Sequence, residues 1–289
     1  MTLITLSLIL LAAFMHAGWN LLLKQEKEKY IASWWATLAG LICLSPVLFF
    51  YPFPQPALWP YALASGALEA VYMIILASAY YRGDYSLVYP ISRGAAPAFL
   101  VVWAVLFLYE TPNIQGIVGI LMIIVGLIVI SSSAFRFNQG TTPLPASNNT
   151  RGLFLALMVA LSISFYSVID GAAVKQTNPV SYIVLVFGVM ILCITPFVIR
   201  HHGWTAMVAE WRNHWLRLTT IGVLAILAYL LVLVVYALSP VSYAGTIREV
   251  SVVIAAIAGS RFLGESFGLK RTVGAIVIFG GILLIALGG

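Results

Sequence analysis

The chain has 289 residues, of which 62% are hydrophobic and only 8% are charged, and its mean hydropathy is +1.03. Soluble domains carry roughly 25% charged residues, so this composition excludes a water-soluble globule, whose surface needs many more charged side chains. The formal net charge is +6 at pH 7, but the lysines and arginines stand between apolar stretches. We therefore attribute the positive charge to membrane topology and expect no nucleic-acid partner.

Five apolar stretches fill the first half of the chain. A membrane-spanning helix needs about 20 predominantly apolar residues, and short polar breaks separate stretches of that length. We predict helices near residues 2–23, 31–50, 58–81, 84–108 and 112–133. No basic residue precedes the first stretch, and many apolar stretches follow it, so we expect a first span rather than a cleaved signal.

A polar segment and five further apolar stretches make up the second half. Residues 135–150 are rich in Pro, Asn, Thr and Gly, which is typical of a linker. The helices predicted after it lie near residues 151–171, 178–199, 215–238, 240–263 and 268–288. The sequence therefore predicts an all-α polytopic membrane protein of ten transmembrane helices, with one five-helix repeat at residues 1–134 and a second at 151–289.

The positive charges are distributed unevenly between the predicted loops. Lys and Arg in short loops are retained on the cytoplasmic side of a membrane. The odd-numbered loops hold Lys24, Lys27, Lys29, Arg82, Arg136, Arg151, Arg200, Arg212, Arg217, Arg261, Lys270 and Arg271. The even-numbered loops hold only Lys175. We expect a multi-pass protein of the bacterial inner membrane with both termini on the periplasmic or extracellular side.

The second half repeats motifs of the first. The run ICLSP at residues 42–46 recurs as LCITP at 192–196, and the pair KQ at 24–25 recurs at 175–176. One constant offset relates Arg93 to Arg248, Glu110 to Glu265, Gly119 to Gly274 and Gly126 to Gly281. Because each half has an odd number of spans, the second copy enters the membrane from the opposite side. Inverted repeats are typical of alternating-access transporters with a midplane site, although channels, flippases and duplications kept only for packing also contain repeats.

Two passages resemble a known group of proteins. One runs from YPISR at residues 89–93 through YETP at 109–112 to the glycines at 116, 119 and 126, and is echoed by GES at 264–266. The other is HAGWN at residues 16–20. With them, essentially the whole chain resembles the ten-helix drug/metabolite transporters with paired EamA-type domains. The resemblance implies transport, with export as the expected direction, and leaves the solute open because such proteins carry amino acids, amines, sugars and drugs.

Polar side chains share one face of the first predicted helix. His16, Trp19 and Asn20 are spaced i, i+3 and i+4, so we expect this face to look inward. His16 either hydrogen-bonds a solute or is a buried neutral histidine tied to a neighbouring helix. Trp19 either stacks on the solute or packs as an apolar side chain.

Glu69 is the strongest single candidate in the first half. It lies near the middle of the third predicted helix, with Tyr72 almost one turn further along the same face. An ionisable group inside the bilayer costs about 3 kcal/mol or more, so its presence is a functional hypothesis by default. A carboxylate at this depth suits proton coupling or amine recognition. The alternative is a structural ion pair with Arg93.

Two arginines lie at equivalent depths in the two halves. Arg93 is about two turns into the fourth predicted helix, where Tyr89 shares its face, and Arg248 is equally deep in the ninth. We expect these arginines to contact an anionic group or to close gates. The alternative is that each one snorkels or pairs structurally, Arg248 with Asp170 or Glu249.

The remaining candidates add an aromatic and polar lining. Tyr166 and Asp170 are spaced i, i+4 in the sixth predicted helix, and Tyr243 precedes the Arg248-Glu249 pair. Asp170 lies near a predicted helix end, where a solvated carboxylate needs no special explanation, so Glu69 ranks above it. Glu110 and Glu265 precede predicted helix starts, where we expect them to act as caps.

The chain lacks the motifs of common enzymes. It contains no Walker sequence, no Gly-x-Ser-x-Gly elbow, no His-Glu-x-x-His pair and no Cys-x-x-Cys pair. His201 and His202, with His214 nearby, form a weak candidate metal cluster without a predicted cavity. We expect no enzymatic activity, no cofactor and no bound metal.

Together these patterns predict a secondary active transporter in the lipid bilayer. We expect it to export small polar or zwitterionic organic metabolites, such as amino acids or amines, by alternating access through a central cavity between the repeats. Proton coupling and either a monomer or a homodimer are compatible with the sequence. The alternatives are a lipid flippase or scramblase and an integral membrane enzyme.

Overall fold

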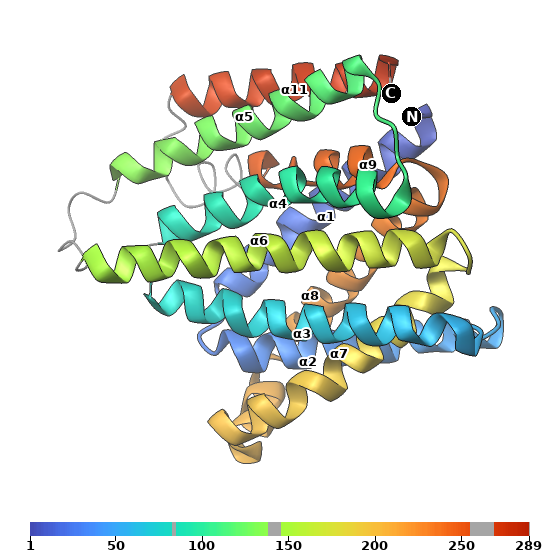
Figure 1. The fold of residues 1–289 in the computed structure, drawn as a ribbon. Helices are drawn as coiled ribbons and strands as arrows, with labels where there is room; N and C mark the ends of the chain where they lie inside the picture. The colour runs from blue at the N-terminus through green and yellow to red at the C-terminus, as the bar shows by residue number, and fades with distance from the viewer. Residues whose placement is uncertain (83–84, 138–145, 255–268, 289) are drawn as a thin grey trace.

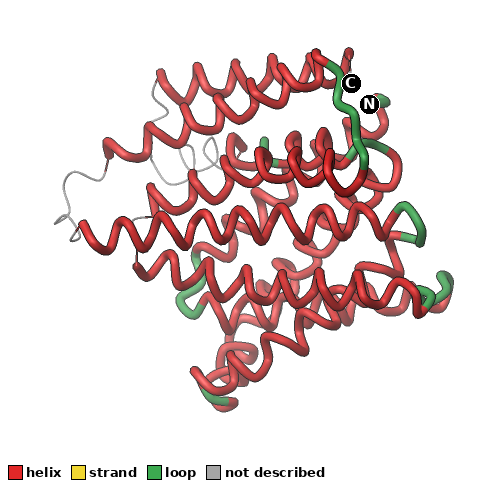
Figure 2. The backbone as a smooth tube through the Cα atoms, viewed as in Figure 1, coloured by secondary structure: helices red, strands yellow, loops and turns green. Residues whose placement is uncertain are grey.

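The computed structural model describes residues 1–82, 85–137, 146–254 and 269–288, and short connections join its helices (Figures 1 and 2). The first half contains α1 (Leu3–Lys24), α2 (Lys29–Leu44), α3 (Trp59–Arg82), α4 (Tyr85–Leu108) and α5 (Ile114–Phe137). Two 3-10 turns, η1 (Ser45–Phe49) and η2 (Pro56–Leu58), connect α2 to α3. The second half contains α6 (Ala146–Val174), α7 (Pro179–His202), α8 (Trp204–Leu238), α9 (Val241–Arg248) and α11 (Leu269–Gly288).

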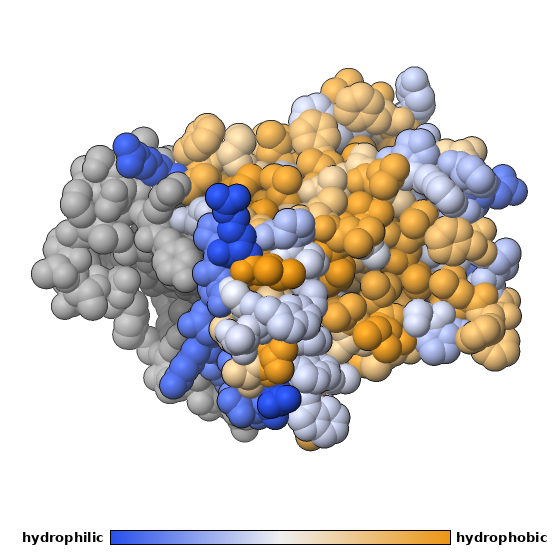
Figure 3. Space-filling model, turned by 90° about the horizontal axis from the view of Figure 1, so that it is seen from below, coloured by the Kyte–Doolittle hydropathy of each residue, from blue (hydrophilic) through white to orange (hydrophobic). Residues whose placement is uncertain are grey.

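The predicted all-α polytopic membrane class is confirmed. Within the described ranges, six segments are long and apolar enough to cross a membrane: Leu3–Leu23, Lys29–Phe49, Pro56–Leu76, Phe154–Val174, Pro179–His202 and Trp204–Leu238. Shorter apolar segments are Ala95–Leu108, Ile114–Val129 and Thr272–Leu287. Figure 3 shows apolar side chains over much of one outer face, with hydrophilic residues gathered in a band toward one end. This distribution fits a surface that lies in lipid.

Two helices of the second half differ from their predicted bounds. The helix predicted at 215–238 begins at Trp204 and bends at His214, whose φ and ψ are −132° and 16°. The added segment packs on α2, because Met207 shares a buried apolar cluster with Trp34 and the ring of Trp211 stacks on that of Trp35. Its charged residues Glu210 and Arg212 interrupt the apolar pattern, so the sequence did not predict it as part of a span. The helix predicted at 240–263 contains α9, which ends at Arg248, a turn at residues 249–250 and helical residues 251–254, and residues 255–263 lie outside the described part of the chain.

Both helices beside the predicted linker are longer than expected. The helix α5 continues to Phe137 and α6 begins at Ala146, so each extends into the range 135–150. Residues 138–145 lie outside the described part of the chain. The division into repeats at 1–134 and 151–289 stays a prediction.

The two terminal helices of the halves, α5 and α11, pack along each other at glycines (Figure 1). A Cβ atom on Gly119 would lie 2.7 Å from the carbonyl oxygen of Gly281, and one on Gly126 would lie 2.7 Å from that of Gly274. A position later in α5 thus meets a position earlier in α11, so the helices run antiparallel. The repeat offset relates Gly119 to Gly274 and Gly126 to Gly281, so it exchanges these two contacts, as a two-fold axis between the helices does.

A second pair of crossings follows the same symmetry. A Cβ atom on Gly66 of α3 would lie 2.6 Å from the carbonyl oxygen of Val186 in α7, and one on Gly222 of α8 would overlap the carbonyl oxygen of Ala36 in α2. Val186 follows Ala36 by 150 positions, the offset of the ICLSP and LCITP motifs. Gly66 and Gly222 are therefore equivalent residues, and each lets backbones approach closely.

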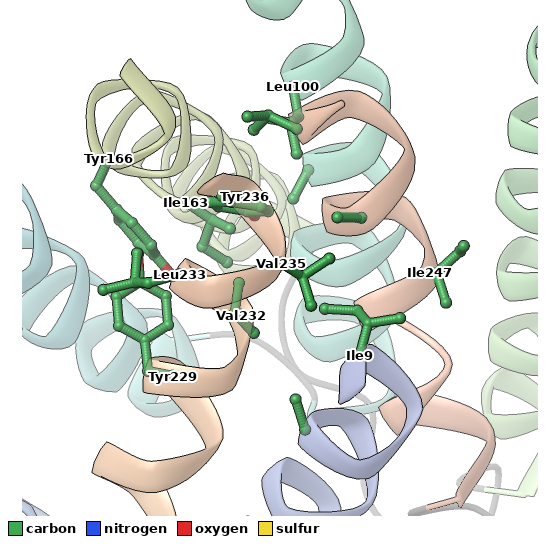
Figure 4. Close-up of a cluster of buried hydrophobic side chains, with 14 of the residues drawn as sticks. Ile9, Leu100, Ile163, Tyr166, Tyr229, Val232, Leu233, Val235, Tyr236 and Ile247 are labelled. Atoms are coloured by element: carbon green, nitrogen blue, oxygen red, sulfur yellow. The ribbon is translucent and has the colours of Figure 1, made fainter. Parts of the chain in front are cut away.

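The chain ends and the core complete the architecture. Both termini lie at one end of the molecule, whereas the last residues of α5 and the first of α6 lie at the other (Figure 1). The helices α1, α3, α4, α6, α8 and α9 pack together. Their buried side chains form a continuous apolar core that includes Ile9, Leu100, Ile163, Leu233 and Ile247 (Figure 4). The polar residues described next lie inside this assembly.

Candidate functional site

Two arginines from opposite halves reach a single carboxylate. The Nη1 atom of Arg93 in α4 donates to Oε2 of Glu249 at 3.4 Å. In α9, Nη2 and Nε of Arg248 donate to Oε1 of the same residue at 3.1 and 3.3 Å. The side chains of Arg248 and Glu249 are 4% and 1% exposed. The bond between Arg248 and Glu249 was one of the expected alternatives, whereas the contact of Arg93 with Glu249 was not among them.

Glu249 lies in the turn that interrupts the ninth predicted helix. It is the C-cap of α9, and the following N–H groups bond to carbonyls three residues earlier, from Val250 to Ile247 at 3.0 Å and from Val252 to Glu249 at 3.0 Å. Such 3-10 turns inside a span often mark a functional hinge. The equivalent stretch of α4 around Arg93 is continuous helix. The same sequence position thus has different backbone structure in the two halves.

Asp170 is enclosed by tyrosines. It is 0% exposed, because α6 continues to Val174. The earlier interpretation of a solvated carboxylate near a helix end is therefore wrong. The hydroxyl of Tyr182 donates to Oδ1 at 2.8 Å, and the hydroxyl of Tyr229 donates to Oδ2. Two hydroxyl donors, one to each carboxylate oxygen, suit an ionised Asp170.

Glu69 differs from the other two acids. It is 7% exposed on α3 and interacts electrostatically with Asp170 and Arg248. Among the described residues, no hydrogen bond or ion pair reaches its carboxylate. A buried carboxylate without a partner is costly, so this group is available to a proton or to a cationic group.

His16 is oriented by its own helix. The Nε1–H of Trp19 donates to Nδ1 of His16 at 2.9 Å, and the side-chain amide of Asn20 donates to the carbonyl oxygen of His16 at 2.7 Å. An acceptor at Nδ1 means that a neutral His16 carries its proton on Nε2. That Nε2 atom is buried and has no hydrogen-bond partner within the described part of the chain. His16 also interacts electrostatically with Arg93 and Arg248, so its donor belongs to the same polar core.

Aromatic rings line this core. The ring centroids of Tyr72 and Tyr166 are 6.2 Å apart, those of Tyr166 and Tyr229 are 6.1 Å apart, and both pairs are T-shaped. Phe187 of α7 continues the series at 6.2 Å from Tyr229. Figure 4 shows Tyr166 of α6 and Tyr229 of α8 pointing toward one another. The acids and arginines thus stand beside an aromatic wall built by four helices.

Tyr243, a predicted site residue, makes its hydrogen bond away from this polar core. The hydroxyl of Tyr243 accepts a hydrogen bond from the backbone N–H of Asn113 at 3.2 Å, which ties the start of α9 to the start of α5. The side chain of Tyr89 lies outside the described residues. Tyr243 is therefore better explained as a packing residue.

Glu110 is a cap, but for a different helix than expected. The chain turns at Tyr109, whose φ is +54°, and the carboxylate of Glu110 then accepts from the N–H groups of Val241 and Ser242 at 2.6 and 3.0 Å. These residues begin α9 in the other half, whereas Asn113 caps α5 by accepting from Gly116 N–H at 2.7 Å. Glu265 lies outside the described residues.

One group of side chains has the composition of a metal site. The ligand atoms of Glu26, Glu210 and His214 lie within 4.8 Å of one another. However, Nε of Arg217 lies 2.8 Å from Oε1 of Glu26, and a guanidinium beside the site opposes a cation. His202 instead approaches Glu28 at 3.7 Å. We assign no metal to these residues.

Sequence reasoning missed the tyrosines that hold Asp170. Tyr182 is fully buried in α7, and Tyr229 and Tyr236 lie seven residues apart on one face of α8. Buried tyrosines usually find a hydrogen-bond partner, so tyrosines in the middle of apolar spans were an available signal. The acid to which Tyr182 and Tyr229 bond depended on how the helices pack.

Comparisons with known proteins agree with this architecture. A model described as the EamA-like transporter family matches residues 3–132 and 150–287. An uncharacterised protein of Methanocaldococcus jannaschii is 38% identical over 73 residues, which are 25% of this chain and 53% of that protein. The match thus spans about half the length of that relative. A crystal structure of a protein with 16% sequence identity has a TM-score of 0.75 and covers 99% of this chain and 96% of that chain, a likeness of fold alone.

Proposed function

Because the chain belongs to the EamA-like transporter family, we propose that it is a secondary transporter of small zwitterionic organic solutes, which it carries through the polar core between its two halves. The observation that carries the proposal is Glu69, a buried carboxylate that no described side chain pairs with. Positive charge comes from Arg248, which interacts electrostatically with Glu69, and from Arg93, which shares the carboxylate of Glu249 with Arg248. Opposite charges in one core suit a solute with an ammonium group and a carboxylate.

The balance of charges supports a role for a proton or an ammonium group. The described core holds three carboxylates, Glu69, Asp170 and Glu249, and two guanidiniums, Arg93 and Arg248. One acid is therefore in excess, and an uncompensated charge inside a membrane is expensive. Asp170 and Glu249 have donors, so Glu69 is the acid that takes up a proton when the solute is absent and faces the ammonium group when it is bound.

The remaining residues shape the site. The aromatic wall of Tyr72, Tyr166 and Tyr229 would contact the apolar part of the solute and can attract its ammonium group through cation–π contacts. The Nε2–H of His16 would donate to an acceptor on the solute. His16 is itself held by Trp19 and Asn20, which makes these two residues positioning residues in the proposal.

Alternating access is the mechanism that the repeat supports best. The α3–α7 crossing has a repeat-related partner in the α2–α8 crossing, and the α5–α11 crossing is its own partner. Two halves that pack equivalently can exchange inward and outward conformations around a central site. We propose export across the bacterial inner membrane, coupled to protons, with both termini periplasmic and with a monomer or homodimer as the working unit. Enzymatic activity and lipid scrambling are not part of the proposal.

Transport assays in proteoliposomes test this function. Purified protein is reconstituted, and uptake of radiolabelled amino acids and amines is measured with and without a pH gradient. We expect saturable flux that the gradient drives and that Glu69→Gln reduces at least about tenfold, because the amide removes a charge interaction worth about 1.4 kcal/mol or more. Glu28→Gln, which removes an acid whose side chain is 55% exposed, is the matched control and should leave flux unchanged.

Two results would contradict the proposal. Unchanged flux in Glu69→Gln, with the protein folded, would remove Glu69 from the site. Flux of lipid without saturation or counter-transport would replace the transporter with a scramblase.

A further inference from the structure

Glu249 has no counterpart in the first half of the chain. The arginines that it binds are repeat equivalents, because Arg248 follows Arg93 by the offset that relates the glycines of α5 and α11. The residue after Arg93 is Gly94, whereas the residue after Arg248 is Glu249. The second half therefore supplies one carboxylate to two symmetric guanidiniums, and each guanidinium approaches a different oxygen of it.

We propose that Glu249 mimics the carboxylate of the solute. It binds both arginines while the site is empty, and a solute carboxylate displaces it from them when the solute binds. This inference rests on the proposed transport function and names the anionic group that the site accepts. A planar group with two oxygens fits between the guanidiniums, because that is the group they hold now.

The contacts of Glu249 suit such an exchange. Its two bonds with Arg248 are 3.1 and 3.3 Å long, and the contact with Arg93 is 3.4 Å. All three are longer than the 2.7–2.9 Å that is usual for charge-assisted hydrogen bonds. A looser ion pair gains less from its own attraction, so an incoming carboxylate with better geometry can replace it.

The backbone at Glu249 can move without unfolding a long helix. The residue lies in the turn between α9 and the helical residues 251–254, where 3-10 bonds replace the regular ladder. Changing φ and ψ in such a turn displaces the carboxylate while both flanking helices stay intact. A carboxylate in the middle of a continuous helix lacks that freedom.

The need to displace Glu249 restricts which solutes can bind. A solute must carry a carboxylate to displace Glu249, so simple amines without one are poor substrates even though Glu69 attracts them. The same competition lowers apparent affinity, because only the fraction of molecules in which Glu249 has withdrawn can bind. Removing the Glu249 carboxylate should therefore tighten the binding of small carboxylates while impairing the closing of the empty site.

Chemical rescue tests this inference without measuring transport. The variant Glu249→Ala removes the carboxylate and leaves room for a small acid between the arginines. We expect sodium acetate to raise its melting temperature by about 5 °C at saturating concentration, and to raise that of the wild type much less. Sodium chloride at equal ionic strength controls for screening, and Asp170→Ala, which removes a buried acid that accepts hydrogen bonds from Tyr182 and Tyr229, controls for a general effect of acetate.

A second variant keeps the test decisive if Glu249→Ala does not fold. Glu249→Gln preserves the volume of the side chain and should bind acetate at least about tenfold more tightly than the wild type, as followed by thermal shift. Equal acetate responses in the wild type, Glu249→Gln and Asp170→Ala would overturn the inference. Failure of Glu249→Gln to fold without acetate, with recovery when acetate is present during purification, would support it.

The outcomes separate this inference from the proposed function. Acetate rescue together with an absence of solute flux would retain the carboxylate site and contradict transport. Saturable transport of amines that lack a carboxylate, with no acetate rescue, would retain the transporter and contradict the role of Glu249.

Discussion

The two halves of the molecule agree in how their backbones cross and differ in where their charges lie. Gly66 and Gly222 bring equivalent helices into close contact, and the α5–α11 crossing is its own symmetric partner. The arginines Arg93 and Arg248 follow this symmetry, but the acids of the core do not. The offset that relates Gly66 to Gly222 relates Glu69 to Ala225, and the offset of the KQ pairs relates Trp19 to Asp170.

This difference indicates separate constraints on the two kinds of position. A backbone crossing fails if either partner gains bulk, so both copies must keep small residues there. Under the proposed function one solute binds in a shared core, so each of its charged groups needs an oppositely charged partner from only one half. Charges can therefore differ between the halves while the packing that positions them stays equivalent.

The largest expected effect comes from breaking the shared packing. Gly222→Val places side-chain atoms on the carbonyl oxygen of Ala36, and Gly66→Val does the same at Val186. We expect each to cost about 3 kcal/mol or more and to abolish recovery of monodisperse protein in size-exclusion chromatography. Gly188→Ala is the control, because a Cβ atom there meets nothing within 4 Å. Normal yield of either valine variant would show that the crossings are not essential.

Replacing either arginine that binds Glu249 should also lower stability, by different amounts in the two halves. Arg248→Gln leaves Glu249 without its two nearest donors inside the second half, and breaking a buried ion pair costs about 3–5 kcal/mol. Arg93→Gln removes the longer contact with Glu249, made by a side chain that is 14% exposed rather than 4%, so we expect a smaller loss. Thermal unfolding of both variants in detergent measures the difference. Equal losses would mean that the two halves hold Glu249 equally.

The cap between the halves should have an intermediate effect. Glu110→Ala removes a carboxylate that accepts from Val241 and Ser242 at the start of α9, and losing a cap of this kind costs about 1–2 kcal/mol. Glu110→Gln keeps one acceptor oxygen and should lose less. Melting temperatures of the two variants check this order, and a lower melting temperature for the glutamine variant would contradict it.

The smallest expected effect concerns a bond that only one half can make. The Nε1–H of Trp34 donates to Oγ1 of Thr195 at 2.8 Å, whereas the residue equivalent to Trp34 in α7 is Val184, which has no donor. Trp34→Phe should cost about 1 kcal/mol and lower the melting temperature by about 3 °C. Thr195→Ser keeps the hydroxyl and serves as the control; if it loses as much as Trp34→Phe, the hydrogen bond is not the cause.

Much of the fold could be predicted because a bilayer imposes simple rules. Apolar runs of about 20 residues become helices, and most helices lie close to their predicted ranges. The errors lie where the rule does not hold. Charged residues conceal the start of α8 at Trp204, and a turn divides the ninth span at Glu249 although the sequence there stays apolar on both sides.

The candidate site was predicted less completely. Polar residues are rare in spans, so the sequence singled out Glu69, Tyr72, Arg93, Tyr166, Asp170, Arg248 and Glu249. The structure brings these residues into one core together with His16. Their pairing was only partly foreseen. The bond between Arg248 and Glu249 was one of the alternatives, whereas the contact of Arg93 with Glu249 joins residues 156 positions apart.

Local hydropathy and spacing along the chain were enough to predict the helical membrane class, which the structure confirms, and to single out the polar residues and the proposed repeat. Only the tertiary structure decided that Glu249 lies between two arginines, that tyrosines hold Asp170 and that Glu110 caps a helix of the other half. These contacts depend on the rotation and depth of each helix against its neighbours, which packing at Gly66, Gly222 and the α5–α11 glycines sets. Hydropathy places a residue in the membrane, and packing selects its partner.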